Sequence, residues 1–118
     1  MILVDTSAWV EHFRRGNSTV KDLLENDEVL IHPFVVGELA CGNLKNRKEI
    51  MSLLNELPAA TVAEHSEVLT LIESRKLYGT GIGWIDAHLV ASAMIAGVKL
   101  LTYDKALGET ASRLGVSA

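Results

Sequence analysis

Four acidic residues are the side chains of this sequence best suited to chemistry: Asp5, Glu38, Asp86 and Asp104. Three of them also have an ordinary structural explanation. Asp5 and Asp104 each follow an apolar run and could cap a helix, and Asp86 opens a helical segment, where an acid complements the helix dipole. Glu38 is harder to explain, because its neighbours three and four positions away along a helix are apolar or small. A carboxylate on such a face is costly unless it is paired or bound to a metal.

Converging carboxylates would indicate a particular chemistry. Four ionised carboxylates repel one another strongly unless protons or cations neutralise them. With no cysteine nearby and no shared ligand spacing among the four histidines, these oxygens favour a hard ion, Mg²⁺ or Mn²⁺. Such an ion with open coordination positions suits phosphate chemistry, because it orients and acidifies a water molecule and stabilises the leaving oxygen. His88, two residues after Asp86, is expected to pack rather than to bind the ion.

The elements that would position these acids follow from the hydrophobic pattern. The apolar run 2–4 predicts a buried strand of a parallel sheet, and further strands are expected at 29–31 and 98–102. A weak strand at 59–63 and an edge strand at Val116 would complete the sheet. Helical periodicity occupies the intervening segments 8–13, 18–24, 33–44, 46–57, 66–78, 84–96 and 104–114, and the third of these is expected to end in the region of Gly42 and Asn43. This alternation predicts an α/β fold, a three-layer α/β/α sandwich with a central, mainly parallel sheet of four to five strands.

That topology predicts that the four acids meet. In right-handed strand–helix–strand units, the carboxyl ends of the strands and the N-termini of the helices lie at one edge of the sheet. Asp5 and Asp104 end strands, Asp86 begins a helix, and Glu38 lies within two turns of a helix start. All four side chains are therefore expected at one rim.

Length and composition predict one domain, residues 1–118. The single cysteine, Cys41, cannot form an internal disulfide, so we expect a core thiol and a reducing compartment. The N-terminus has no basic region before its apolar run, and the apolar helix 85–96 is too short to cross a bilayer. These features predict a soluble, cytoplasmic protein with no signal peptide.

The net charge of −4 looks unfavourable for binding a polyanion. Fifteen acidic residues face 11 basic ones, but setting the four candidate ligands aside leaves 11 of each. The surface is then balanced, so the charge does not exclude a polyanionic substrate if cations neutralise the acids.

Four short motifs carry a resemblance to a known family. They are the opening run Ile2–Ser7, the segment Val36–Leu39 with Gly42, the segment Trp84–Ala91, and Leu101–Asp104. In this order and at these spacings they resemble the PIN-domain family, specifically the VapC-like ribonuclease toxins of bacterial type II toxin–antitoxin systems. The resemblance covers essentially the whole chain. One departure is Leu107, where the family often has phenylalanine, and it affects packing more than chemistry.

The resemblance implies a function and a set of residues. It implies a Mg²⁺-dependent endoribonuclease, with Mn²⁺ able to substitute, that cleaves RNA through metal-activated water as the toxin of a toxin–antitoxin pair. It also implies an antitoxin partner that reaches the acidic rim, and a homodimer. The implied metal ligands and catalytic residues are Asp5, Glu38, Asp86 and Asp104. The implied supporting hydroxyls are Thr6, Ser7 and Thr102.

Basic residues that could contact RNA phosphates form two groups. They are Arg14 and Arg15 in the first group and Lys45, Arg47 and Lys48 in the second. Solvated surface charge is the more common explanation of each group taken by itself.

Three other classes of protein could carry such a cluster of acids. A response-regulator receiver needs an aspartate at the end of its third strand, and the segment 59–63 has none. A phosphatase with an aspartyl nucleophile needs a second acid two residues after Asp5, where Ser7 stands. The third alternative is a non-catalytic PIN-like binding module whose acidic cluster is structural, and the sequence leaves it open.

Overall fold

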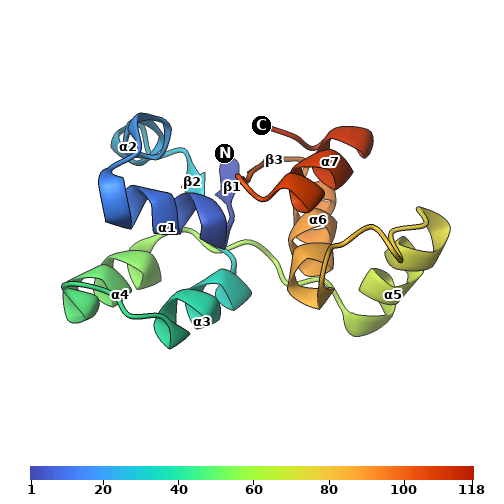
Figure 1. The fold of residues 1–118 in the computed structure, drawn as a ribbon, viewed down its shortest axis with the longest axis horizontal. Coiled ribbons are helices and arrows are strands. Elements are labelled where there is room, and N and C mark those ends of the chain that lie inside the picture. Colours follow the sequence, from blue (N-terminus) through green and yellow to red (C-terminus); the bar gives the residue numbers. More distant parts are fainter.

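The computed structural model describes all residues, 1–118, and places a parallel sheet between two groups of helices (Figure 1). The strands are β1 (Ile2–Val4), β2 (Val29–Leu30) and β3 (Lys99–Leu101), in the order β2-β1-β3. In the central strand, Leu3 pairs with Leu30 on one side and with Leu100 on the other. Leu3 is fully buried, as the apolar run predicted.

The sheet has three strands, so the expectation of four to five was wrong. Both missing strands are reduced to single parallel bridges, one pairing Ile31 with Ala59 and the other pairing Leu100 with Ser117. On the first edge, Pro58 accepts a hydrogen bond from Ile31 but has no N–H of its own to extend the ladder. On the second edge, Gly115 turns the chain at a φ of 74° just before its single paired residue.

Seven helices connect the strands. Their bounds are close to those predicted from periodicity except for the helix expected at 66–78, which ends at Ser74 and is followed by Lys76 at a φ of 55°. The helices are α1 (Thr6–Arg15), α2 (Ser18–Glu25), α3 (Pro33–Cys41), α4 (Arg47–Glu56), α5 (His65–Ser74), α6 (Trp84–Ala96) and α7 (Lys105–Arg113). Helices α1 to α4 lie on one side of the sheet and α5 to α7 on the other (Figure 1). The three-layer arrangement expected from the alternation of strands and helices is therefore present.

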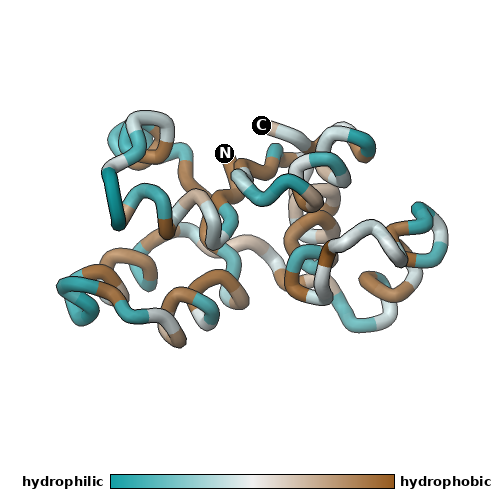
Figure 2. Tube along the Cα trace, in the orientation of Figure 1, coloured by the Kyte–Doolittle hydropathy of each residue, from teal (hydrophilic) through white to brown (hydrophobic).

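Helix α6 is the buried helix of the fold. All residues from Ala87 to Ala93 are buried, and Gly97 ends the helix with a φ of 66°. The traces of β1 and much of α6 are hydrophobic in Figure 2, consistent with their central positions. Because α6 is held on several sides, its first turn, which contains Asp86, has a fixed position relative to the sheet.

Helix α3 ends at the break that was expected near Gly42 and Asn43. Its last residue is Cys41, and the extended backbone of Gly42 then starts a loop that runs to Asn46. The Arg47 guanidinium donates hydrogen bonds to the carbonyls of Ala40 and Gly42, which stabilises this end of the helix. Cys41 is exposed at the last turn, so the prediction of a core thiol was wrong.

The apolar residues of α1 belong to the core. Trp9 is fully buried, and its ring stacks on that of Phe13 with centroids 5.5 Å apart. No helix in the structure is both long enough and apolar enough to span a membrane.

Candidate active site

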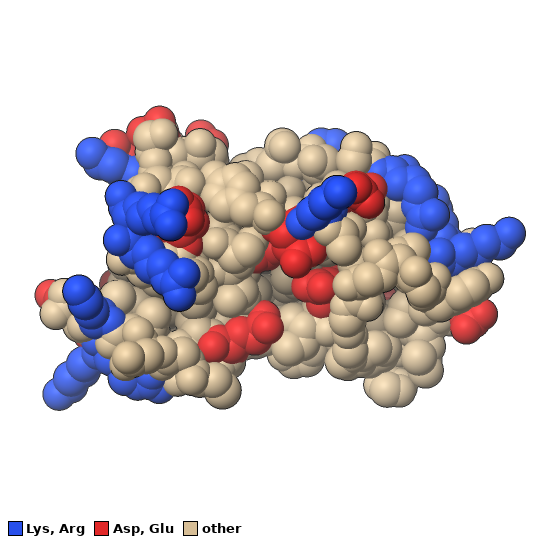
Figure 3. All heavy atoms as spheres, in the orientation of Figure 1, with Lys and Arg blue, Asp and Glu red and all other residues tan.

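The four acids predicted to converge lie around one edge of the sheet. Asp5 directly follows β1 and Asp104 comes three residues after β3, so both lie beyond the carboxyl ends of paired strands. Asp86 is the third residue of α6, and Glu38 lies in the second turn of α3. Figure 3 shows acidic side chains gathered near the middle of this face, with lysines and arginines mainly toward its two ends.

Asp5 is the most buried of the four acids, with 4% of its surface exposed. Its carboxylate accepts hydrogen bonds from the backbone N–H of Ser7 and from the Thr102 hydroxyl. The oxygen of Thr102 also accepts from the Asp104 N–H at 3.0 Å and lies 3.3 Å from the Ser7 hydroxyl. These contacts fasten the end of β1 to the end of β3, so Asp5 has one defined orientation.

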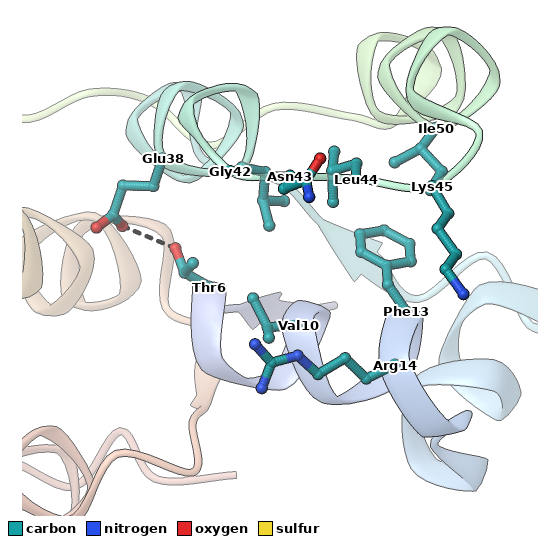
Figure 4. Close-up of a pocket in the computed structure, with 11 residues that line it drawn as sticks. Thr6, Val10, Phe13, Arg14, Glu38, Gly42, Asn43, Leu44, Lys45 and Ile50 are labelled. Carbon is teal, nitrogen blue, oxygen red and sulfur yellow. Dashed lines mark hydrogen bonds between the residues drawn. The ribbon is translucent and has the colours of Figure 1, made fainter.

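The other three acids also make local hydrogen bonds. Thr6 Oγ1 donates to Glu38 Oε1 at 2.7 Å, which turns the glutamate toward α1 (Figure 4). Asp86 Oδ2 accepts from the Gly83 N–H at 3.1 Å, and Asp104 Oδ1 accepts from the Leu107 N–H at 2.9 Å. Each of the last two is thus a helix cap as well as a candidate ligand. The predicted supporting hydroxyls, Thr6, Ser7 and Thr102, all lie among the four acids.

The electrostatics of Asp86 link it to the other acids. Burial raises its pKa above the ordinary value, and the hydrogen bond from the Gly83 N–H opposes that shift. The negative charges of Asp104, Asp5 and Glu38 raise the pKa further. Asp86 therefore lies in the combined field of three carboxylates from three other segments, which is not expected of an isolated helix cap.

The donor set fits a hard divalent cation. As the side chains stand, no three of the acids are close enough together to hold an ion, because each carboxylate is turned toward a cap or a hydroxyl. One oxygen each of Glu38, Asp86 and Asp104 makes no hydrogen bond. Mg²⁺ is commonly held by one or two carboxylates, with water and phosphate oxygens completing its octahedron. An all-oxygen set that includes uncommitted carboxylate oxygens meets this requirement and disfavours softer metals.

Comparison with known proteins agrees with this geometry. The family model described as "PIN domain" matches residues 2–112. The chain belongs to the PIN domain family. This confirms the resemblance inferred from the four motifs.

Two relatives of this PIN domain are named as ribonucleases. "Ribonuclease VapC32" of Mycobacterium tuberculosis strain H37Rv is 43% identical over 118 residues, covering 99% of this chain and 95% of the relative. The protein of the same name from strain CDC 1551 matches equally well.

The basic residues predicted to contact RNA have different surroundings in this PIN domain. Arg14 and Lys45 line a pocket that reaches Glu38 (Figure 4). Arg15 instead lies 4.0 Å from Glu11. The remaining two do not line this pocket, since the Arg47 guanidinium caps the end of α3 and Lys48 is exposed on the first turn of α4. Two of the five cations thus line the pocket that ends at Glu38.

Histidine and aromatic rings pack together near the start of α6. The ring of His88 lies between Phe34, at 4.7 Å, and Trp84, at 4.8 Å, so the expectation that it packs is confirmed. Burial lowers the pKa of His88, and the charge of His65 lowers it further. The His32 ring also contacts Phe34, with centroids 5.0 Å apart, but this histidine has a separate structural role.

Two residues of this region were not singled out from the sequence. His32 caps α3, since its Nδ1 accepts from the Phe34 N–H at 3.0 Å, and histidine is not among the usual capping residues. Asn43 lines the same pocket as Arg14 and Lys45, in the loop after α3, and the sequence pattern indicates it only as part of the break that ends this helix.

Proposed function

We propose that this PIN domain is a Mg²⁺-dependent endoribonuclease, with Mn²⁺ as an alternative ion. The observation that carries the proposal is the placement of Asp5, Glu38, Asp86 and Asp104 around one edge of the sheet, beyond the carboxyl ends of β1 and β3. Burial raises the pKa of Asp86, and the charges of Asp104, Asp5 and Glu38 raise it further. Carboxylates that repel one another in this way favour a bound cation. The 43% identity to a protein named as a ribonuclease supports RNA as the substrate.

The proposal assigns two roles to these residues, holding the ion and positioning its ligands. Asp5, Glu38, Asp86 and Asp104 would hold the ion, which supplies an activated water and stabilises the leaving oxygen of the phosphodiester. Thr102 and the Ser7 N–H hold Asp5 in place, and Thr6 holds Glu38. Such outer contacts orient ligands, and their loss commonly weakens metal sites by about 10- to 100-fold.

Cleavage of RNA tests this proposal. Purified protein is incubated with total cellular RNA and Mg²⁺, and new 5′ ends are sequenced. We expect cuts that vanish with excess chelator, return with Mg²⁺ or Mn²⁺, and are missing for Asp5→Asn. The matched control, Asp22→Asn, applies the same change to an exposed acid on α2 and should cut normally. Cleavage that persists undiminished in chelator would refute a metal-dependent mechanism.

We further propose a biological setting, the toxin of a toxin–antitoxin pair in the cytoplasm. The four-motif resemblance and the VapC name of the relatives support it. The partner would be an antitoxin protein that covers the acidic rim. Expression of the wild-type chain alone should arrest growth, and co-expression of the antitoxin should relieve that arrest. A chain that never arrests growth would count against the toxin role.

We also propose a homodimer, as the resemblance to the VapC-like toxins implies. Trp9 and Leu54 are fully buried and contribute nothing to an interface. Leu53 and Leu69 are 41% and 47% exposed, but they lie on α4 and α5, on opposite sides of the sheet (Figure 1). Scattered exposed apolar side chains are common on monomers, so the resemblance is what supports the dimer. Light scattering should give twice the chain mass at micromolar concentration, and a monomer there would exclude the dimer.

A non-catalytic binding module remains the second candidate. The observation in its favour is that each acid already has a local hydrogen-bond donor and that no three form a closed cluster. In that case the acids would stabilise helix starts, and no RNA cleavage would depend on them.

A further inference from the structure

A pocket beside the candidate cation site has no role in the function proposed above. It lies between α1, α3 and the loop before α4, and its volume is about 410 Å³. Thr6 and Glu38 form one end and Lys45 lies at the other, with the Arg14 guanidinium between them beside Val10 (Figure 4). Pockets that enclose small ligands usually measure roughly 300–1,000 Å³, so this one can hold a base and its sugar.

The positive charges of the two cations in the pocket are not neutralised by acids of the protein. Neither Arg14 nor Lys45 has an acidic partner within ion-pair distance, whereas the neighbouring Arg15 is paired with Glu11. Two unpaired cations that line the same cavity attract an anion of matching size. A phosphate group meets this description, because arginine and lysine both donate readily to its oxygens.

The wall between the two ends is aromatic and apolar. Phe13 is half-buried, and its ring is held by stacking on Trp9 at 5.5 Å and 23°. Its position is therefore fixed before any ligand binds. The Asn43 side chain is exposed in the loop and makes no hydrogen bond within the protein, so its amide offers a donor and an acceptor together. An aromatic face beside a free amide is a common way to bind an unpaired base.

We propose that this pocket binds one nucleotide of single-stranded RNA adjoining the scissile phosphate. The base packs against Phe13 with its edge on Asn43, the scissile phosphate lies between the acids and Arg14, and the next phosphate lies at Lys45. The order of acids with Arg14, then Phe13, then Lys45 along the pocket (Figure 4) matches the order phosphate, base, phosphate along one strand. This inference rests on the proposed nuclease function. A peptide is the other conceivable occupant, but a free amide beside two unpaired cations matches a nucleotide better.

Cleavage-end sequencing on four variants tests the assignment. Asn43→Ala should relax the base preference next to the cut by about tenfold, because a well-formed base contact discriminates by about that factor or more. Phe13→Leu should lower kcat/KM on a short RNA carrying the strongest wild-type cut by about tenfold, through lost stacking. Arg14→Gln and Lys45→Gln should each weaken cleavage of all sequences equally. Each should also reduce the slope of log RNA affinity against log salt concentration (the salt slope) by about 1. Lys21→Gln, which removes a cation outside the pocket, should match wild type.

The outcomes separate this inference from the proposed function. If the wild-type protein makes no metal-dependent cuts, the nuclease function fails and the pocket assignment fails with it. If the wild type cuts RNA and all four variants keep its base preference, rate and salt slope, only the pocket assignment is overturned, leaving a peptide as the occupant. Arg14, Asn43 and Lys45 are exposed, so their variants test the proposal even if Phe13→Leu is poorly folded.

Discussion

Replacing Asp86 with asparagine is expected to abolish RNA cleavage while making the metal-free protein at least as stable as wild type. Burial and three neighbouring carboxylates raise the pKa of Asp86, so its ionised form destabilises the folded state at every pH above that raised pKa. The penalty disappears as the pH falls below the ordinary pKa of an aspartate, where the carboxyl is protonated in both states. Asparagine carries no charge and removes the penalty throughout.

Metal should reverse this ranking. A cation that binds only the folded state stabilises it by roughly 2.7 kcal/mol at 100 times its dissociation constant. The asparagine variant should lose much of that gain, and its cleavage rate should fall by at least about 100-fold. If Asp86 were only a cap for the Gly83 N–H, the same substitution would instead lower the free energy of unfolding of the metal-free protein by about 0.5–1 kcal/mol.

Paired thermal melts distinguish the two roles of Asp86. Wild type, Asp86→Asn and Asp22→Asn are each melted with chelator and with Mg²⁺. Asp22→Asn should retain the full Mg²⁺ shift, because Asp22 lies on α2 among exposed residues. An Asp86→Asn protein that is less stable without metal yet keeps the whole Mg²⁺ shift would show that Asp86 is a cap and that the four-acid site is wrong.

Acid pH is expected to produce the largest change in stability, through His32. This fully buried ring is neutral, with Nδ1 accepting from the Phe34 N–H. Its Nε2 lies 3.2 Å from Ser92 Oγ, which itself donates to the Thr61 carbonyl. The proton of the neutral ring is therefore assigned to Nε2. A second proton could only go to Nδ1, where it would face the Phe34 N–H and remove the cap of α3.

The direction of the pH effect follows from the two pKa values. Burial, with a smaller contribution from the charge of His88, lowers the pKa of His32 from 6.5 to about 4. The unfolded chain binds the proton first as the pH falls. The stabilisation is thus complete above pH 6.5 and is lost as the pH falls to about 4. A shift of this size corresponds to about 3 kcal/mol of unfolding free energy.

Urea unfolding across that pH window measures the effect of His32. His32→Asn keeps an oxygen that can cap the Phe34 N–H but does not titrate, so its stability should fall much less between pH 6.5 and about pH 4. His65→Asn makes the same change at an exposed histidine and should retain the wild-type loss. Equal losses for wild type and His32→Asn would contradict the assignment.

The convergence of the acids could be predicted because it depends on topology alone. Asp5 and Asp104 follow apolar runs that had to be parallel strands, and β1 and β3 prove to be neighbours. Helix α6 has the predicted bounds, Trp84–Ala96, since its apolar run ends at a glycine with positive φ. These features follow from local patterns that the tertiary structure does not override.

Other features depend on contacts that no local pattern encodes. The two outer strands shrink to single bridges, because edge positions gain little from burial and end at the first residue that cannot pair. The loop after α3 is held by Arg47, which comes from the following helix. This loop contains Asn43 and packs against α1 only in the folded chain, so the pocket could not be found from periodicity.

Titration with Mn²⁺, followed by electron paramagnetic resonance, tests most directly whether the four acids act as one centre. Wild-type protein should show saturable binding, and Asp5→Asn and Asp86→Asn should each weaken it by at least about tenfold, since each removes a ligand from the same ion. Asp22→Asn should bind as wild type does. Absence of saturable binding by the wild type, or unchanged affinity in the Asp5→Asn and Asp86→Asn proteins, would contradict a common cation site.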